Sequence, residues 1–268
     1  MTARSVGAGG WSSRLLAAHT WAVYLFFYLP IALLVVFSFG ESRLVGVMGG
    51  LSLRWYRQML ANDQMWAAVG NSLTVAFWST AVSTVLGTAA ALSLERFRYR
   101  GRRAFDGLLY LPIIIPDIAM AVMLLLFFVQ ITQPVGLGLG IGSITLSHIA
   151  FNISFVAVVV RARLAGLDPA LEEAAADLYA GRWQAFRRVT LPLILPGVLG
   201  GALLALTLSL DDVVITSFVT GVGSTTLPVY VFGLVKRGVT PMINAISTLM
   251  LVASMVLVLA SLVVQRRR

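Results

Sequence analysis

The hydrophobic residues of this sequence are grouped in long runs, and most of the charged residues lie between those runs. A helix needs about 20 mainly apolar residues to cross the hydrocarbon core of a bilayer. The pattern therefore predicts an all-α integral membrane protein with six transmembrane helices. The predicted helices cover residues 21–39, 65–94, 107–131, 143–160, 193–219 and 242–264.

The segments outside these runs are short. Residues 1–20 are predicted to be a cytoplasmic N-terminal segment, and residues 265–268 a cytoplasmic tail. A cleaved signal peptide is the alternative for residues 21–39, but such peptides have an apolar core of about 7–15 residues. We expect residues 21–39 to remain as the first transmembrane helix, and residues 65–264 to form the main transmembrane domain with five helices.

Composition supports a membrane protein and excludes several other classes. Hydrophobic residues make up 59% of the chain and charged residues 12%, whereas soluble domains carry about 25% charged residues. The net charge of +9 does not indicate nucleic-acid binding, because the basic residues lie at the ends of apolar runs. The absence of cysteine excludes disulfides and thiolate metal sites, and no metal site is predicted.

The basic residues also predict the orientation of the chain. If both termini are cytoplasmic, most of the 20 Lys and Arg residues fall on the cytoplasmic side, as the positive-inside rule requires. This orientation places residues 165–192 in the cytoplasm. Five arginines between the second and third runs are interpreted as topology signals: Arg96, Arg98, Arg100, Arg102 and Arg103.

The loop over residues 165–192 is predicted to contain a docking helix. Its acidic residues precede its basic ones, an order that favours a helix through the helix dipole. Asp168 is placed to cap the start of this helix. Ala174, Ala175 and Leu178 share one side, and such small residues allow another surface to approach closely.

Carboxylates also occur inside the apolar runs, at Asp117, Asp211 and Asp212. A charged residue at mid-membrane costs about 2.5–3.5 kcal/mol, so these residues must face protein, water or a ligand. Ser209, Asp212 and Thr216 recur at steps of three or four residues, which predicts one polar stripe on the fifth span, a run that Asp211 and Asp212 interrupt. Asp211 lies about 100° from that stripe.

His148 and Asn152 form a comparable polar side on the fourth run. Together with the stripe they predict a translocation path, and acidic side chains suit a polycationic solute. Hydrogen bonds between packed helices are the alternative for each of these residues.

The chain cannot hydrolyse ATP through a Walker A loop, which needs a Gly-Lys pair. Its single lysine, Lys236, follows Val235. The energy for transport must come from a separate ATPase subunit or from an ion gradient. If an ion gradient supplies the energy, the chain is an ion-coupled secondary transporter that uses the intramembrane aspartates. A more remote alternative is an intramembrane hydrolase whose two carboxylates are Asp117 and Asp212.

Two groups of motifs resemble a known family. Glu173-Ala174-Ala175, followed by Asp177-Leu178 and by Thr190-Leu191-Pro192-Leu193, resembles the EAA loop of type I ABC-importer permeases. The block from Ser209 to Thr216, together with Arg54-Trp55-Tyr56, Asn71-Ser72-Leu73-Thr74, Thr226-Leu227-Pro228 and residues 238–245, resembles the spermidine/putrescine permeases.

The resemblance implies the type I ABC importer transmembrane-domain fold and two sets of functional residues. Coupling to the ATPase is expected at Glu172, Glu173, Ala174, Ala175, Asp177, Leu178, Gly181, Leu191 and Pro192. The substrate pathway is expected at Asp211, Asp212, Asp117, Ser209, Thr216, His148 and Asn152. No catalytic residue is expected, because the family's permeases transport without catalysing a reaction.

The resemblance further implies a polyamine importer in the bacterial cytoplasmic (inner) membrane. The expected partners are a second homologous permease subunit, a dimer of ATP-binding subunits, an extracytoplasmic polyamine-binding protein and membrane lipid, but no nucleic acid. The chain itself is expected to bind no cofactor, since ATP and magnesium are used by the partner ATPase.

One position departs from the family pattern. The family has glycine directly after the aspartate-leucine pair, where this sequence has Tyr179, and the next glycine is Gly181. Tyrosine at positive φ is strained. We therefore expect the turn to move two residues along the chain or to use a different geometry.

Overall fold

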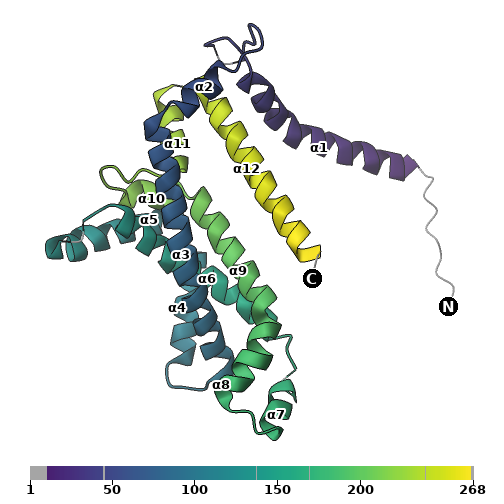
Figure 1. Ribbon diagram of the computed structural model, residues 1–268, viewed down its shortest axis with the longest axis vertical. Helices are drawn as coiled ribbons and strands as arrows, with labels where there is room; N and C mark the ends of the chain where they lie inside the picture. Colours follow the sequence, from purple (N-terminus) through teal and green to yellow (C-terminus); the bar gives the residue numbers. More distant parts are fainter. Residues whose placement is uncertain (1–10, 45, 137, 169, 239, 267–268) are drawn as a thin grey trace. The chain divides into compact units, whose positions relative to one another are not determined.

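The computed structural model describes residues 11–44, 46–136, 138–168, 170–238 and 240–266, and most of these residues are helical (Figure 1). The chain divides into two compact units. The first consists of residues 1–63 and 233–268, and the second of residues 64–232. The two units are described separately below.

The first unit contains α1 (Trp11–Ser38), α2 (Arg54–Leu60) and α12 (Pro241–Arg266), and α12 contacts both other helices. The apolar side chains of α1 are largely exposed, as expected for a helix surrounded by lipid. Because α1 begins at Trp11, the second half of the predicted N-terminal segment is helical. Residues 1–10 of that segment, and residues 267–268 of the predicted tail, lie outside the described residues.

Among the described residues, four helical runs are long and apolar enough to cross a membrane. They are Ser13–Ser38 in α1, α3 (Asp63–Arg96), α6 (Ile141–Leu164) and the run Arg182–Asp211, which ends in α9 (Leu191–Asp211). A bent pair of helices makes a fifth if it is counted as one span, and the apolar stretch Pro241–Val256 of α12 is shorter than a span. The predicted six spans are compatible with this set of helices.

The bent pair consists of α4 (Arg102–Ile114) and the helical run Asp117–Thr132, which begins with α5 (Asp117–Phe127). The helix axis bends by 111° between them. Proline has no N–H to donate and disfavours helical geometry at the preceding residue. Ile115, which precedes Pro116, is accordingly extended, with φ −70° and ψ 131°. The predicted span over residues 107–131, which Pro112 and Pro116 were expected to interrupt, is therefore broken at Pro116, whereas Pro112 lies inside α4.

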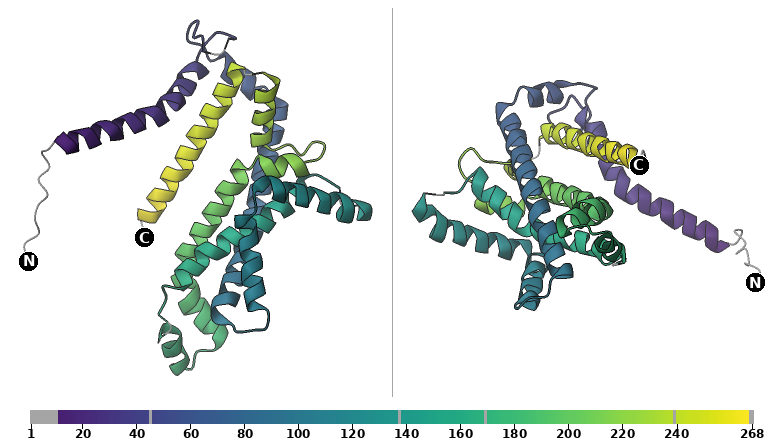
Figure 2. Two further views of the ribbon diagram at one scale, coloured as in Figure 1. Left: turned by 180° about the vertical axis from the view of Figure 1, so that it is seen from behind. Right: turned by 60° about the horizontal axis from the view of Figure 1, so that its bottom comes forward.

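The core of the second unit is built by close contact of α3, α6 and α9, and α6 and α9 run side by side in Figures 1 and 2. A Cβ atom on Gly87 of α3 would lie 2.7 Å from Cβ of Val156 in α6, and one on Gly201 of α9 would lie 3.2 Å from Cγ1 of the same valine. Small residues allow such close packing in a membrane, where apolar burial gives no drive for association.

Helices α10 (Val214–Val219) and α11 (Leu227–Arg237) follow α9. The loop between them is fixed to α3 by hydrogen bonds. Asn71 donates through Nδ2 to the carbonyl oxygens of Gly223 and Thr225, both at 3.0 Å, and Ser72 Oγ accepts from the N–H of Leu227 at 2.8 Å.

Candidate functional site

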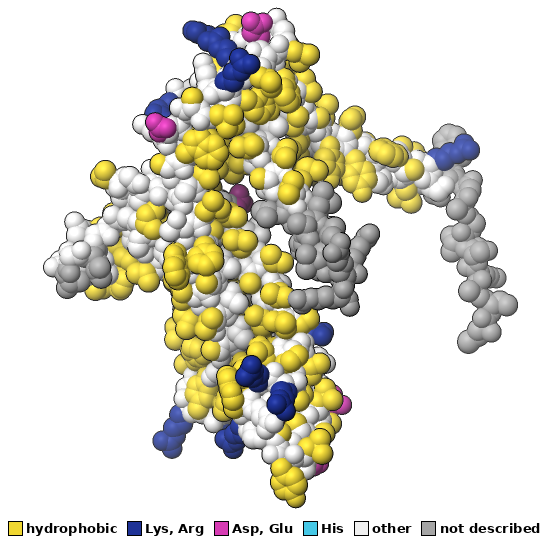
Figure 3. All heavy atoms as spheres, in the orientation of Figure 1, with side chains coloured by type: hydrophobic (Ala, Val, Ile, Leu, Met, Phe, Trp, Pro, Cys, Tyr) yellow, Lys and Arg dark blue, Asp and Glu magenta, His cyan; other side chains and the backbone are white. Residues whose placement is uncertain are grey.

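The predicted docking segment consists of α7 (Ala170–Asp177), α8 (Arg182–Ala185) and a π-helical turn, Phe186–Thr190, that leads into α9. Asp168 Oδ1 accepts the N–H of Ala170 at 3.0 Å, so the predicted cap is present. The segment lies at one end of the second unit. Arginine side chains gather at that end, whereas apolar side chains cover most of the visible face of the unit (Figure 3).

Glu172 holds α7 to the rest of the unit. Its Oε1 lies 2.7 Å from Nη2 of Arg96 at the end of α3, and it accepts a hydrogen bond from Thr190 Oγ1 at 2.6 Å. The next residue, Glu173, is exposed, and so is Ala174. Two adjacent glutamates therefore differ: one is directed inward, and the other is available at the surface.

The turn after α7 corrects the expectation for Tyr179. Tyr179 has φ +59°, the left-handed conformation that the family's glycine would occupy. The N–H of Ala180 donates to the carbonyl of Ala175 at 3.0 Å, and the N–H of Tyr179 donates to that of Ala176 at 2.9 Å. These two bonds define a Schellman motif. The turn has not moved to Gly181, because the two hydrogen bonds that close α7 require the left-handed residue at position 179.

Large apolar side chains are exposed around this turn. The exposed fraction is 83% for Leu178, 98% for Tyr179 and 71% for Trp183, whose ring lies 5.5 Å from that of Phe186. We call these three residues the exposed ridge. Of the other predicted coupling residues, Asp177, Gly181 and Pro192 are exposed, and Ala175 and Leu191 are half-buried.

The second predicted site is a buried polar cluster between α3, α6, α9 and α10. His148 of α6 is fully buried, with Nδ1 2.7 Å from Ser209 Oγ and Nε2 3.0 Å from Thr216 Oγ1. Ser209 is also 3.0 Å from Ser79 Oγ of α3. Because Thr216 Oγ1 donates to Asp212 Oδ2 at 2.7 Å, the hydroxyl must accept from His148, so the histidine carries a proton on Nε2.

Asp212 belongs to this cluster through the geometry of the backbone. Helix α9 ends at Asp211, and Asp212 is extended, with φ −68° and ψ 125°. Its carboxylate accepts the N–H groups of Ile215 and Thr216 at 3.3 and 2.7 Å, which satisfies the first turn of α10. The residues of the predicted stripe do meet, but not through helical spacing: the helix breaks after Asp211, and Asp212 caps its second part.

Asp211 and Asp117 are not part of the cluster. Both are exposed, and within the described part of the chain neither has a hydrogen-bond or ion-pair partner. Asp117 begins α5 directly after the bend at Pro116. The structure thus separates the three intramembrane aspartates into one that is enclosed and two that face outward.

Asn152 lies one helical turn from His148 on α6 and is fully buried. Its Nδ2 donates to the carbonyl of Ala205 in α9 at 3.3 Å, and its Oδ1 has no partner within the described residues. This contact joins two packed helices, which was the alternative considered for this residue.

Three residues of these sites were not predicted as site residues from the sequence. Ser79 extends the buried cluster to α3, Arg96 pairs with Glu172, and Thr190 donates to the same carboxylate. Arg96 is one of five arginines in a short loop, and no local pattern distinguishes it from the others. Ser79 lies seven residues after Ser72 on the buried face of α3, a spacing of two helical turns that could have indicated it.

The fold is that of solved ABC transporter structures. The chain is 20% identical to a chain of a bacterial ABC transporter involved in the import of the acidic polysaccharide alginate, with a TM-score of 0.76. The match covers 96% of this chain and 94% of the other. This likeness confirms the predicted transmembrane-domain fold.

Sequence comparisons identify the family. Residues 83–268 match the model of the binding-protein-dependent transport system inner membrane component. The chain is 46% identical over 231 residues to the putrescine transport system permease protein PotI of Escherichia coli (strain K12), covering 85% of this chain and 82% of the relative. It is 42% identical to the spermidine/putrescine transport system permease protein PotC of Haemophilus influenzae, covering 93% and 96%. The chain therefore belongs to the family of binding-protein-dependent transport system inner membrane components and is, as predicted, a transport subunit and not an enzyme.

Proposed function

We propose that this chain is one of the membrane subunits of an ATP-driven importer of polyamines, putrescine or spermidine. In this proposal it pairs with a second, homologous permease subunit, and a binding protein delivers the solute from outside. A dimer of ATP-binding subunits uses ATP and magnesium on the cytoplasmic side, where both termini lie. Two polyamine permeases that are more than 40% identical over most of both chains support this assignment.

The observation that carries the proposal is the exposed ridge beside α7. Leu178, Tyr179 and Trp183 are large, apolar and mostly exposed, and such patches mark surfaces that bind a partner. Glu173 and Ala174 are exposed on the same short helix and supply a carboxylate and a small residue. This combination suits a groove on an ATPase subunit that has an apolar floor and a basic rim.

The structure also supports a route by which movement of α7 reaches the membrane helices. Glu172 connects α7 to the end of α3 through Arg96 and to the turn before α9 through Thr190. An ATPase that displaces α7 would therefore move two spans as well as the loop. Such rigid transmission is a recognised means of coupling domain closure to a distant gate.

The intramembrane aspartates support a cationic solute. Asp211 and Asp117 are exposed and unpaired within the described residues, and a carboxylate facing lipid would cost about 2.5–3.5 kcal/mol. We therefore place them on the face toward the partner permease and the translocation path, where protonated amines would balance their charge. Asp212, Ser209, Thr216, His148 and Asn152 then support the wall of that path from behind.

The experiment that tests this proposal replaces two exposed residues of α7. The variant Glu173→Arg/Ala174→Trp is co-expressed with the partner subunits, and ATPase co-purification and putrescine uptake into proteoliposomes are measured. We expect both to be lost. The variant Glu41→Arg, which reverses a loop charge in the first unit, is the matched control and should retain both.

Two results would contradict the proposal. Undiminished ATPase co-purification and uptake in the α7 variant would exclude this surface as the coupling site. Gradient-driven uptake by the purified chain alone, without ATP or other subunits, would favour the secondary transporter. A panel of solutes presented on the binding protein, with stimulation of ATPase activity as the readout, would identify the polyamine.

A further inference from the structure

The loop between α3 and α4 has more positive charge than the described structure neutralises. Its two carboxylates, Glu95 and Asp106, both pair with Arg161 of α6. Arg96 is paired with Glu172. The remaining arginines have no carboxylate partner within the described part of the chain; they are Arg98, Arg100, Arg102 and Arg103.

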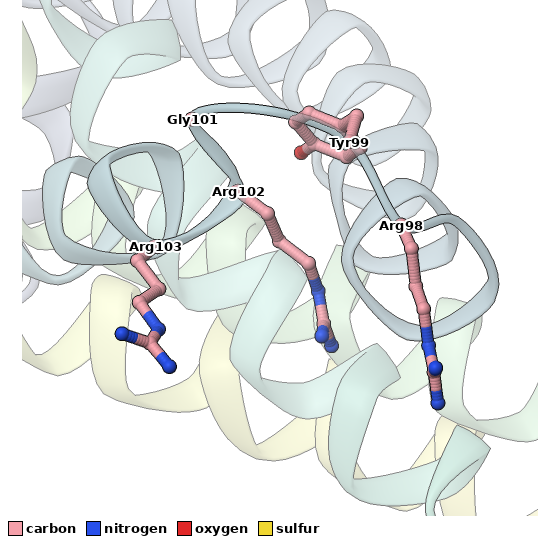
Figure 4. Close-up of a pocket in the computed structure, with 5 residues that line it drawn as sticks. All are labelled: Arg98, Tyr99, Gly101, Arg102 and Arg103. Carbon is pink, nitrogen blue, oxygen red and sulfur yellow. The ribbon is translucent and has the colours of Figure 1, made fainter.

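Three of these arginines line an open hollow on the surface. Arg98, Arg102 and Arg103, with Tyr99 and Gly101, line a space of about 330 Å³, which lies at the lower end of the range for ligand pockets. Figure 4 shows the side chains of Arg98 and Arg102 extending in the same direction from the loop. Gly101 has φ +87°, which lets the chain reverse so that arginines on both sides of it line one pocket.

The first turn of α4 also lies at this pocket. Gly101 is the residue before α4, which begins with Arg102, and it has no side chain to cap the first turn. The positive end of the helix dipole therefore adds to the three guanidinium groups. Guanidinium groups and free helix-start amides are the donors that proteins use to bind phosphate.

Exposed apolar side chains occur close to these arginines in the sequence. Phe97 is 61% exposed and Leu108 61% exposed, and the rings of Tyr99 and Phe105 are also exposed. The loop joins the ends of α3 and α4, so these side chains lie where a membrane-spanning helix meets water. Aromatic residues at this level contact the boundary between headgroups and acyl chains.

We infer that the pocket of Arg98, Arg102 and Arg103 binds the phosphate of an anionic phospholipid, whose acyl chains lie against Phe97 and Leu108. A soluble phosphate compound offers the same anionic group but nothing for the apolar flank to contact. The acidic surface of a partner protein would leave that flank exposed. The inference does not depend on which solute is transported.

The test uses the full chain, purified in detergent and titrated with phosphatidylglycerol or phosphatidylcholine while bound lipid is counted by native mass spectrometry. We expect the wild-type chain to retain phosphatidylglycerol selectively. Because each basic residue near a membrane surface contributes roughly 1 kcal/mol, the variant Arg98→Gln/Arg102→Gln/Arg103→Gln should bind it on the order of 100-fold more weakly.

A second variant, which removes the same number of charges elsewhere, distinguishes binding in this pocket from general electrostatic attraction of the lipid. Arg182→Gln/Arg187→Gln/Arg188→Gln removes three exposed arginines from the same end of the second unit and should retain phosphatidylglycerol. If the glutamine variant of the pocket is not monodisperse, Arg98→Lys/Arg102→Lys/Arg103→Lys replaces it. Lysine keeps the charge but loses the planar fork of donors, so binding should weaken several-fold.

The outcomes that overturn the inference are distinct. Equal loss in the charge-matched variant would assign the effect to overall charge. Phosphatidylcholine has the same phosphate beside a choline cation, so its equal retention would show that the net negative charge of the headgroup plays no role. Displacement of phosphatidylglycerol by inorganic phosphate at equal concentration would assign the pocket to a soluble phosphate compound and not to a lipid.

Discussion

Glu172 of α7 and Arg96 of α3 form an ion pair with 2.7 Å between Oε1 and Nη2. The pair joins the proposed coupling helix to a membrane-spanning helix of the same unit, whereas the neighbouring Glu173 is exposed. Under the proposed function, the exposed Glu173 would contact the ATPase, and Glu172 would transmit the movement of α7 to α3.

The first prediction concerns this ion pair. The side chains of Arg96 and Glu172 are 28% and 31% exposed, and pairs that are partly exposed to water contribute about 0.2–1 kcal/mol to stability. Arg96→Gln should therefore leave the chain folded and bound to its ATPase while uptake of putrescine per ATP hydrolysed falls several-fold. Coupled uptake and ATPase assays on the reconstituted complex measure this ratio.

Two controls accompany that variant. Arg43→Gln removes an arginine in the first unit and should not change the ratio. The charge-swapped variant Arg96→Glu/Glu172→Arg should restore part of the coupling. An unchanged ratio in Arg96→Gln would show that this ion pair does not transmit the movement.

The second prediction concerns the strained turn after α7. A left-handed backbone costs an L-residue roughly 1–2 kcal/mol relative to glycine, and Tyr179 has φ +59°. Tyr179→Gly should stabilise α7 by about 1 kcal/mol, seen as slower hydrogen exchange of its amides. Tyr179→Ala removes the same ring but keeps the strain, so it should show no such gain.

These two variants also distinguish the backbone strain at position 179 from a contact between the Tyr179 ring and the ATPase. If the ring of Tyr179 binds the ATPase, both variants should weaken ATPase co-purification, although only the glycine variant stabilises the helix. Equal exchange rates in the two variants would mean that the turn carries no strain at this position.

The third prediction separates the adjacent aspartates. Asp211→Asn removes an exposed charge and should raise the KM for putrescine at least several-fold with little change in thermal stability. Asp212→Asn replaces the carboxylate that accepts the N–H and the hydroxyl of Thr216. A buried donor without a suitable acceptor costs about 1–3 kcal/mol of stability, so this variant should have a lower thermal midpoint. A stability loss in the first variant and none in the second would reverse the roles assigned here.

The fourth prediction concerns the contact between α3 and α6. A Cβ on Gly87 would lie 2.7 Å from Cβ of Val156, whereas a Cβ on Gly70 of the same helix has nothing within 4 Å. Gly87→Ala should therefore destabilise the chain by about 1–3 kcal/mol through overpacking. Gly70→Ala is the matched control and should be neutral or gain up to about 1 kcal/mol from helix propensity. Thermal unfolding of the detergent-solubilised chain followed by circular dichroism compares the two.

The helices of this chain could be predicted from hydrophobic runs because a span must be both long and apolar. The breaks in the helices were harder to predict. Pro116 marks the bend between α4 and α5, and proline has a known local effect. The break at Asp212 depends on a side chain that satisfies two backbone amides of the next turn, and helical periodicity alone cannot reveal such a bond.

In the candidate sites, too, local residue patterns predicted some features, whereas others depend on specific hydrogen bonds or on contacts between distant residues. Residue types and motifs predicted the coupling loop, and Asp168 caps it as expected. The conformation of Tyr179 was mispredicted, because the two hydrogen bonds that close α7 outweigh the cost of a left-handed tyrosine. Arg96 could not be selected from five nearby arginines, because its role depends on a contact with a residue far away in the chain.

The end of α9 at Asp211 has an electrostatic consequence. The aligned peptide dipoles of a helix leave about half an elementary negative charge at its last carbonyl groups. In α9 that partial charge lies beside the exposed carboxylate of Asp211, while the start of α10 is satisfied by Asp212. The negative end of the α9 dipole therefore adds to the charge of Asp211, so a carboxylate here attracts an ammonium group more strongly than it would in the middle of an unbroken helix.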